Sequence, residues 1–225
     1  NSRPTLVYNP HFSRKLRSID AFGEKLIQAV VRDGRYNLIV APHIRLAQSW
    51  TEAEREKWQA LSVSGQVIVD LASDRLIDMT YTLAADLYIG DVSSQVYEFV
   101  TRSRPCLFVN AHAAVWDGNP DYAMWKLGEV VAPDCDPLVA IDRAWASFPG
   151  YADVQKSRAR ATLDAIDWHE DGTALLRGDD PIVRAANEVA DTVAMENGPQ
   201  VVPGDRDGDA AGRGLLARAG FEAAQ

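Results

Sequence analysis

Short apolar runs that alternate with helix-like segments constrain the fold of this chain more than any other feature. The runs read TLVYNP, YNLIVAP, QVIVDL, DLYIGD, RPCLFVN and GEVVA. Apolar residues follow one another within them, which is typical of strands buried on both faces of a parallel sheet. Parallel strands need crossover connections, usually helices, and these crossovers are right-handed. The sequence therefore predicts an α/β fold, a Rossmann-like parallel sheet of about six strands with helices on both faces.

The segments between these runs carry helix signals. Residues 20–34 have helical apolar spacing and stop at Gly34. Residues 51–62 open with Thr51 and have Glu54 three positions later, the pattern of a capping box. Further helices are expected over 75–85 and 94–103, whereas 111–128 reads as a Gly-, Asp- and Trp-rich loop with room for one helical turn.

Helical patterns continue beyond the last apolar run. Helices are expected over 136–147, 151–166 and 181–195, and the last of these has Asp180 as N-cap and Pro181 at its first position. From residue 197 the chain is rich in Gly, Asp, Arg and Ala. We therefore expect one Rossmann-like nucleotide-donor-binding domain over 1–196 and a flexible tail over 197–225, with a short helix at 214–221.

Composition restricts the partners. The 225 residues carry a net charge of −9, which disfavours nucleic acid as a partner, so that any phosphate must be held by a few placed groups. No run resembles a signal peptide or membrane span. Cys106 and Cys135 lie far apart and are expected to be reduced thiols. We expect a cytoplasmic protein, at most peripheral at the inner face of the membrane, that needs no metal and no cofactor.

Ligands of open parallel sheets bind beyond the carboxyl ends of the strands, so the residues just after each strand are the candidates for chemistry. His11, His43 and His112 fall in these windows. The most specific of these post-strand segments is IGDVSSQVYE, where a strand ends at Gly90-Asp91 and two serines precede a helix. The start of such a helix can bind phosphate, and Glu98, one turn on, can accept hydrogen bonds from a ribose. The alternative is that Ser93 or Ser94 only caps the helix and Glu98 is solvated.

This segment resembles the "ADxLITDYSSxxFDxxxxxxP" signature of the CDP-glycerol glycerophosphotransferases, a family of GT-B type, and more distantly the "TDSGGxxEE" segment of UDP-N-acetylglucosamine 2-epimerases. TLVYNPHFSRK is similar to the family's "vlYaPTwR" segment and NLIVAPHIRL to its "lllrpHP" segment, which places His43 on the family's histidine. The resemblance covers roughly residues 4 to 131. The matching residues of the signature are Asp86, Asp91, Ser93, Ser94, Glu98 and Pro105.

The departures concern both the signature and the domain count. Gly90 replaces the usual Thr, Val92 the Tyr, and Ile44 the Pro after His43. The family's "RG" appears as KLG, which leaves Lys126 as a weaker phosphate cation. GT-B enzymes have two Rossmann-like domains, and the resemblance is to the C-terminal, donor-binding one. It implies that an acceptor domain is missing from this chain or is supplied elsewhere.

What the resemblance implies is a transferase that moves glycerol phosphate or a sugar from a CDP- or UDP-activated donor to a glycan, lipid or polymer acceptor. His43 would be the catalytic residue, stabilising charge on the leaving phosphate. Ligand-binding residues would be Asp91, Ser93, Ser94, Glu98, Arg14, Lys126 and His112. Alternatives for single residues stay open: His43 as a histidine hydrogen-bonded to a neighbouring loop, Arg14 as a solvated cation, Asp91 as a loop brace, and His112 with Trp116 as part of a folded loop. The alternatives for the whole chain are a UDP-sugar 2-epimerase-like enzyme or a non-catalytic nucleotide-binding module.

Overall fold

The computed structural model describes residues 2–162, 166–168 and 174–176. The chain divides into two compact units, Asn1–Leu163 and Asp164–Gln225. In the second unit, β7 (Ile166–Trp168) and β8 (Ala174–Leu176) form an antiparallel pair. The helix predicted over 181–195 and the tail predicted over 197–225 lie outside the described residues.

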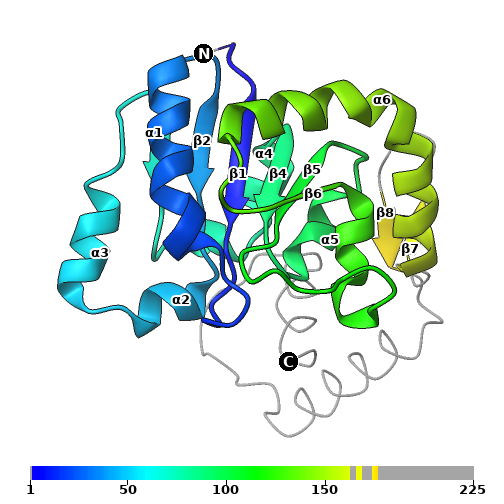
Figure 1. The fold of residues 1–225 in the computed structure, drawn as a ribbon, viewed down its shortest axis with the longest axis horizontal. Helices are drawn as coiled ribbons and strands as arrows, with labels where there is room; N and C mark the ends of the chain where they lie inside the picture. Colours follow the sequence, from blue (N-terminus) through cyan, green and yellow to red (C-terminus); the bar gives the residue numbers. More distant parts are fainter. Residues whose placement is uncertain (1, 163–165, 169–173, 177–225) are drawn as a thin grey trace, which may run out of the picture. The chain divides into compact units, whose positions relative to one another are not determined.

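The first unit is built on a six-stranded parallel sheet, shown in Figure 1. Its strand order is β3-β2-β1-β4-β5-β6, so the order reverses between β1 and β4. This is the doubly wound arrangement of Rossmann-like folds, and it confirms the predicted fold class. The strands are β1 (Thr5–Asn9), β2 (Asn37–Val40), β3 (Val67–Val69), β4 (Leu87–Gly90), β5 (Cys106–Val109) and β6 (Glu129–Val131).

Helices cover both faces of the sheet because right-handed crossovers run in opposite directions from the reversal between β1 and β4. Successive strand residues point to opposite faces. Leu6 and Tyr8 belong to the core that includes Phe22 and Leu26 near the start of the chain. Tyr88 instead packs on the other face, with its ring 5.6 Å from that of Phe99. The helices are η1 (Ile19–Gly23), α1 (Glu24–Asp33), α2 (Ile44–Ser49), α3 (Glu52–Gln59), η2 (Asp74–Leu76), α4 (Thr80–Ala84), α5 (Gln95–Phe99), η3 (Pro120–Leu127) and α6 (Pro137–Thr162).

The predicted helix ends near the N-terminus are confirmed. Helix α1 ends at Gly34, which adopts the left-handed φ of 75° and donates its N–H to the Val30 carbonyl. Helix α3 begins with the capping box, in which the Thr51 side chain accepts from the Glu54 N–H and Glu54 accepts from the Thr51 N–H. Helix α2 was not predicted, because its six residues carry no periodic apolar pattern.

Three predicted helical segments are wrong in detail, and the helix expected over 94–103 is shorter than predicted, since α5 covers Gln95–Phe99. The helix expected over 75–85 is broken into η2 and α4, because Met79 adopts a φ of 65° and Asp78 caps Thr80 with a 2.9 Å hydrogen bond. The helices expected over 136–147 and 151–166 are the single α6, which contains Pro149 and ends at Thr162. Ile166 belongs to β7 instead.

Helix α6 tolerates its proline because tertiary contacts hold it on both sides. Ile141 and Ala144 are buried before Pro149, and Gln155 and Ala159 after it. The Gln155 amide donates to the carbonyls of Arg104 and Leu127, at 2.8 Å each. A helix-interior proline costs about 3 kcal/mol, which such packing can offset. Figure 1 shows α6 changing direction along its length. No helix in the described part of the chain has both the length and the apolar character that a membrane span requires.

Candidate functional site

The carboxyl ends of β2, β1 and β4 are joined by a buried hydrogen-bond network. The Asn9 amide donates to the Ala41 carbonyl at 2.7 Å, and the Tyr88 hydroxyl donates to Asn9 Oδ1 at 3.0 Å. Gly90 leaves room for this ring, because a Cβ at position 90 would lie 2.6 Å from the Tyr88 hydroxyl. The glycine at position 90 is thus coupled to the presence of the Tyr88 ring.

Asp91 shapes the loop that follows β1. Its Oδ2 accepts hydrogen bonds of 2.9 Å from the N–H groups of His11 and Ser18, and the residue is fully buried. Its Oδ1 is buried without a partner among the described residues. Burial raises the pKa of Asp91 to about 7, although its hydrogen bonds with Ser18 and His11 oppose this shift. In this position the carboxylate braces the His11 loop, and a contact between Asp91 and a ligand stays a prediction.

The loops after β1 and β2 bring two imidazoles together. The rings of His11 and His43 lie 6.2 Å apart between centroids, and Phe12 lies against both of them. His11 Nδ1 accepts from the Ser13 N–H at 2.9 Å, and His43 Nδ1 accepts from the Arg45 N–H at 3.2 Å. A ring nitrogen that accepts carries no hydrogen, so each neutral ring bears its hydrogen on Nε2.

Both imidazoles favour the neutral form. Burial, with a smaller effect of His43, lowers the pKa of His11 to about 4. Burial and then the Arg45 guanidinium lower the pKa of His43. At neutral pH these rings therefore offer Nε2–H donors rather than positive charges.

The serine turn after β4 is held by a hydrogen bond to Ser93 and not by a side-chain cap from Ser94. Ser93 is buried, and its hydroxyl accepts from the Gln95 N–H at 3.3 Å. Ser94 is exposed, and its side chain makes no capping bond to α5. Because α5 has five residues, its helix dipole is small. Any phosphate contact at this turn depends on the exposed Ser94 and on neighbouring groups.

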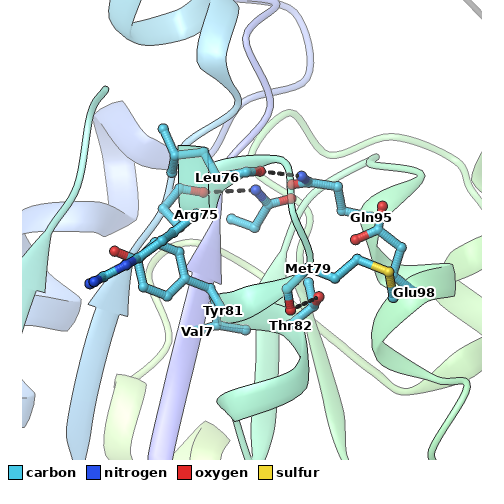
Figure 2. A pocket seen from close by; sticks show the side chains of 10 residues that line it. Val7, Arg75, Leu76, Met79, Tyr81, Thr82, Gln95 and Glu98 are labelled. Carbon is cyan, nitrogen blue, oxygen red and sulfur yellow. Dashed lines mark hydrogen bonds between the residues drawn. The ribbon is translucent and has the colours of Figure 1, made fainter. Parts of the chain in front are cut away.

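Glu98 lines a small cavity between the sheet and the segments η2, α4 and α5. Figure 2 shows Glu98 and Gln95 approaching from α5, with Met79, Tyr81 and Thr82 opposite them. The cavity has a volume of about 10 Å³, enough for one water-sized group. Glu98 Oε2 is buried without a partner among the described residues. Burial raises the pKa of Glu98 to about 7, against an opposing effect of the Thr82 hydroxyl. The solvated alternative for Glu98 is therefore wrong.

The loop after β5 carries His112 on the same edge of the sheet. Its Nε2 lies 3.2 Å from the Arg17 carbonyl, in the loop after β1. Trp116 packs edge-on against Trp125, with centroids 6.0 Å apart, and Trp125 donates to the Asp91 carbonyl at 2.9 Å. This part of the loop is thereby fixed to the end of β4.

Two cations, Lys126 and Arg14, were predicted to bind phosphate. Lys126 comes at the end of η3, just before the amino end of β6, and its carbonyl accepts from Tyr151 and Arg158 of α6. A phosphate contact of the Lys126 side chain stays a prediction. Arg14 is exposed on the loop after β1, and it helps to lower the pKa of Glu54. Asp86 also lies at an amino end, where it accepts from the Thr5 N–H.

Sequence spacing did not pair His11 with His43, nor did it show that Tyr81 and Thr82 face Glu98. The first pairing has a sequence signal, since the first two strands of a right-handed crossover are neighbours and each is followed by a histidine. The second has none, because it depends on the break of the helix at Met79.

No known family model matches this chain, and no curated protein sequence resembles it significantly. Solved structures, in contrast, resemble this chain in fold. CalG4, the calicheamicin glycosyltransferase, has a TM-score of 0.50 and 16% identity over 87% of this chain and 44% of its own. Sucrose-phosphate synthase from Thermosynechococcus elongatus has a TM-score of 0.49 and 16% identity over 87% of this chain and 46% of its own. The wall teichoic acid polymerase TagF has a TM-score of 0.47 and 12% identity over 87% of this chain and 44% of its own.

This chain spans less than half the length of each of these three proteins. Identities this low establish the fold alone. The fold is the Rossmann-like α/β domain found in GT-B glycosyltransferases.

Proposed function

We propose that this chain is the donor-binding domain of a GT-B-type transferase, which binds the nucleoside diphosphate of an activated donor. The donor would be CDP- or UDP-linked, and the group moved would be glycerol phosphate or a sugar. The observation that carries the proposal is Glu98, whose Oε2 is buried without a partner among the described residues and faces a cavity large enough for one hydroxyl group. A buried acceptor without a donor is costly, and a ribose hydroxyl would supply that donor.

The neighbouring groups suit the diphosphate. His11 and His43 offer two Nε2–H donors from adjacent strand ends, and Ser94 offers an exposed hydroxyl. Hydrogen bonds from these donors become stronger as negative charge accumulates on the departing phosphate. Protonation of His43 on binding would add charge stabilisation, because a bound dianion favours imidazolium.

The acceptor site belongs to a second domain in this proposal. The carboxyl edge described above supplies donors and one carboxylate to the nucleotide. We therefore assign the base that activates the acceptor to a second domain, which would close over this edge. The acceptor itself would be a glycan, lipid or polymer.

Calorimetry with matched ligands tests the proposal. CDP and UDP should bind much more tightly than cytidine and uridine, because charge-assisted phosphate contacts dominate. Ser94→Ala should reduce this difference, whereas Ser49→Ala, whose hydroxyl donates to the Leu46 carbonyl in α2, should leave it unchanged. Equal affinities for nucleoside and diphosphate would contradict the proposal.

A further inference from the structure

Asp91 joins the two loops of the proposed diphosphate site. It lies directly after β4 and comes three residues before the exposed Ser94. Its Oδ2 accepts from the N–H groups of His11 and Ser18, at 2.9 Å each, in the loop after β1. A fully buried carboxyl group thus holds the loop that carries His11 beside the turn that carries Ser94.

The two oxygens of Asp91 have different surroundings. Oδ2 has both backbone donors, whereas Oδ1 is buried without a partner among the described residues. A neutral carboxyl group can keep its carbonyl oxygen at Oδ2 as an acceptor and carry its hydrogen on Oδ1. Protonation of Asp91 therefore leaves the hydrogen bonds to His11 and Ser18 in place.

The charges around Asp91 favour its neutral form. Burial is the largest cause that raises its pKa, and the anionic Asp20 of η1 contributes in the same direction. The Asp20 carboxylate forms an ion pair of 2.6 Å with Arg17. In the described part of the chain, no lysine or arginine forms an ion pair with Asp91 itself. A buried carboxyl group without a paired cation is more stable uncharged.

The titratable side chains that face Asp91 from β1, β4 and the loop after β1 are neutral. Burial, and next the charge of Asp91, raises the pKa of Tyr8 in β1 and of Tyr88 in β4. His11 is neutral because its pKa is lowered to about 4. In these surroundings the pKa of Asp91 is about 7, so a charge added nearby changes its protonation near neutral pH.

A diphosphate at this site would bring negative charge close to Asp91. Three residues span at most about 10 Å, which limits the distance from Asp91 to the Ser94 turn. On the other side, the same residue whose N–H binds Oδ2, His11, would donate its Nε2–H to the anion. Charges this close repel one another strongly where little water screens them. Binding of a diphosphate therefore favours the neutral form of Asp91.

We propose that Asp91 is a positioning residue of the diphosphate site, and that its Oδ1 takes up a proton from solvent when a diphosphate binds. Asp91 acts through His11 and does not touch the ligand. The inference rests on the proposed function, because the diphosphate supplies the charge. It deepens that function by coupling donor binding to the protonation of a buried group.

Calorimetry on the full chain with CDP tests the proton uptake. Between the free-state pKa of about 7 and the higher value in the complex, the CDP affinity of wild type should fall by up to tenfold per pH unit as pH rises. Asp91→Asn keeps an oxygen for the two N–H groups but does not titrate, so its slope should be shallower by this amount. Titrations in two buffers of different ionisation enthalpy count the protons directly. Equal slopes and equal proton counts in the two proteins would overturn the inference.

Two further variants complete the test. Asp86→Asn is the matched control, since Asp86 also accepts a backbone N–H, from Thr5 at 2.7 Å, but just before the start of β4. It should keep the wild-type slope, and the protonation of CDP itself is common to all of these proteins. Asp91→Ala removes the acceptor and should weaken CDP binding about tenfold at pH 6, the loss expected when a buried N–H has no partner.

Asp91→Asn should bind CDP like wild type at pH 6, because both side chains are then neutral. An Asp91→Ala variant with wild-type affinity at pH 6 would refute the positioning role. If this variant does not fold, the slope of Asp91→Asn still decides the inference.

Inorganic pyrophosphate separates this inference from the proposed function, because it carries the charge without a nucleoside. If pyrophosphate binds as tightly as CDP, the proposed function fails, whereas a pH slope that Asp91→Asn removes would still support the inference. If CDP binds more tightly, but with equal slopes in wild type and Asp91→Asn, the inference fails and the proposed function stands. Absence of binding by both ligands would refute both.

Discussion

The ring of His11 lies 6.2 Å from the ring of His43, and the Nδ1 of each accepts a backbone N–H from its own loop. In the neutral state, the N–H hydrogen of each ring therefore lies on Nε2. Because β1 and β2 are adjacent parallel strands, the pair is a direct product of the sheet order. An anion bound at the carboxyl ends of β1 and β2 would contact two imidazoles whose charge depends on pH.

Diphosphate affinity should therefore depend on pH through His43. The pKa of His43 is lowered in the free protein, and a bound dianion should raise it, so binding takes up a proton between the two values. Affinity should increase as pH falls through this window and decrease as pH rises through it. NMR titration of the imidazole protons with and without CDP measures both pKa values.

Two variants sharpen this prediction. His43→Ala should flatten the pH dependence, and Arg45→Gln should move the window to higher pH by removing a cation that lowers the pKa of His43. If His43 titrates identically in saturating CDP, it has no role in binding the diphosphate.

Glu98→Gln should weaken binding through the ribose. The change keeps the size of the side chain but removes the charge, which should cost roughly 1–3 kcal/mol, the range for hydrogen bonds to charged groups. The 2′-deoxy nucleotide should lose less affinity than the ribonucleotide. Calorimetry with UDP and 2′-deoxy-UDP measures both losses, and equal losses would show that Glu98 does not accept from the 2′-hydroxyl.

Asp91 should make the stability of the fold depend on pH. Its folded-state pKa is raised from 3.8 to about 7, so the folded state binds more protons than the unfolded state between these values. Its contribution is fully present below about pH 3.8 and is lost as pH rises through 7. Asp91→Asn keeps an oxygen for His11 and Ser18 but does not titrate. Wild type should therefore lose stability relative to this variant from pH 4 to pH 8 in urea unfolding, and a constant difference would contradict the assignment.

Gly90→Ala should destabilise the fold, because the new Cβ would lie 2.6 Å from the Tyr88 ring. Overpacking of this kind costs roughly 1–3 kcal/mol. Combined with Tyr88→Leu, the substitution should cost less than the sum of the two single changes. Gly150→Ala in α6 is the control, since its Cβ meets nothing within 4 Å, and it should stabilise by about 0.5–1 kcal/mol through helix propensity. Additive costs at Gly90 and Tyr88, measured by urea unfolding, would show that the two residues are not coupled.

The sequence by itself determined the elements whose signals are local. The strands were predictable because Leu6, Val7 and Tyr8 are consecutive and apolar, as a strand buried on both faces requires. The start of α3 and the end of α1 were predictable because a capping box and a left-handed glycine act on their nearest neighbours. The windows after the strands followed from a general property of parallel sheets.

Only the tertiary structure decided what those windows contain. It placed His11 beside His43, and it directed Glu98 into a cavity whose other side follows the break of the helix at Met79. It also decided that α6 continues past Pro149 as a single helix. The histidine pair and the course of α6 depend on contacts between residues far apart in the sequence, and the free energy of burying and pairing such groups exceeds the local preferences that sequence spacing reports.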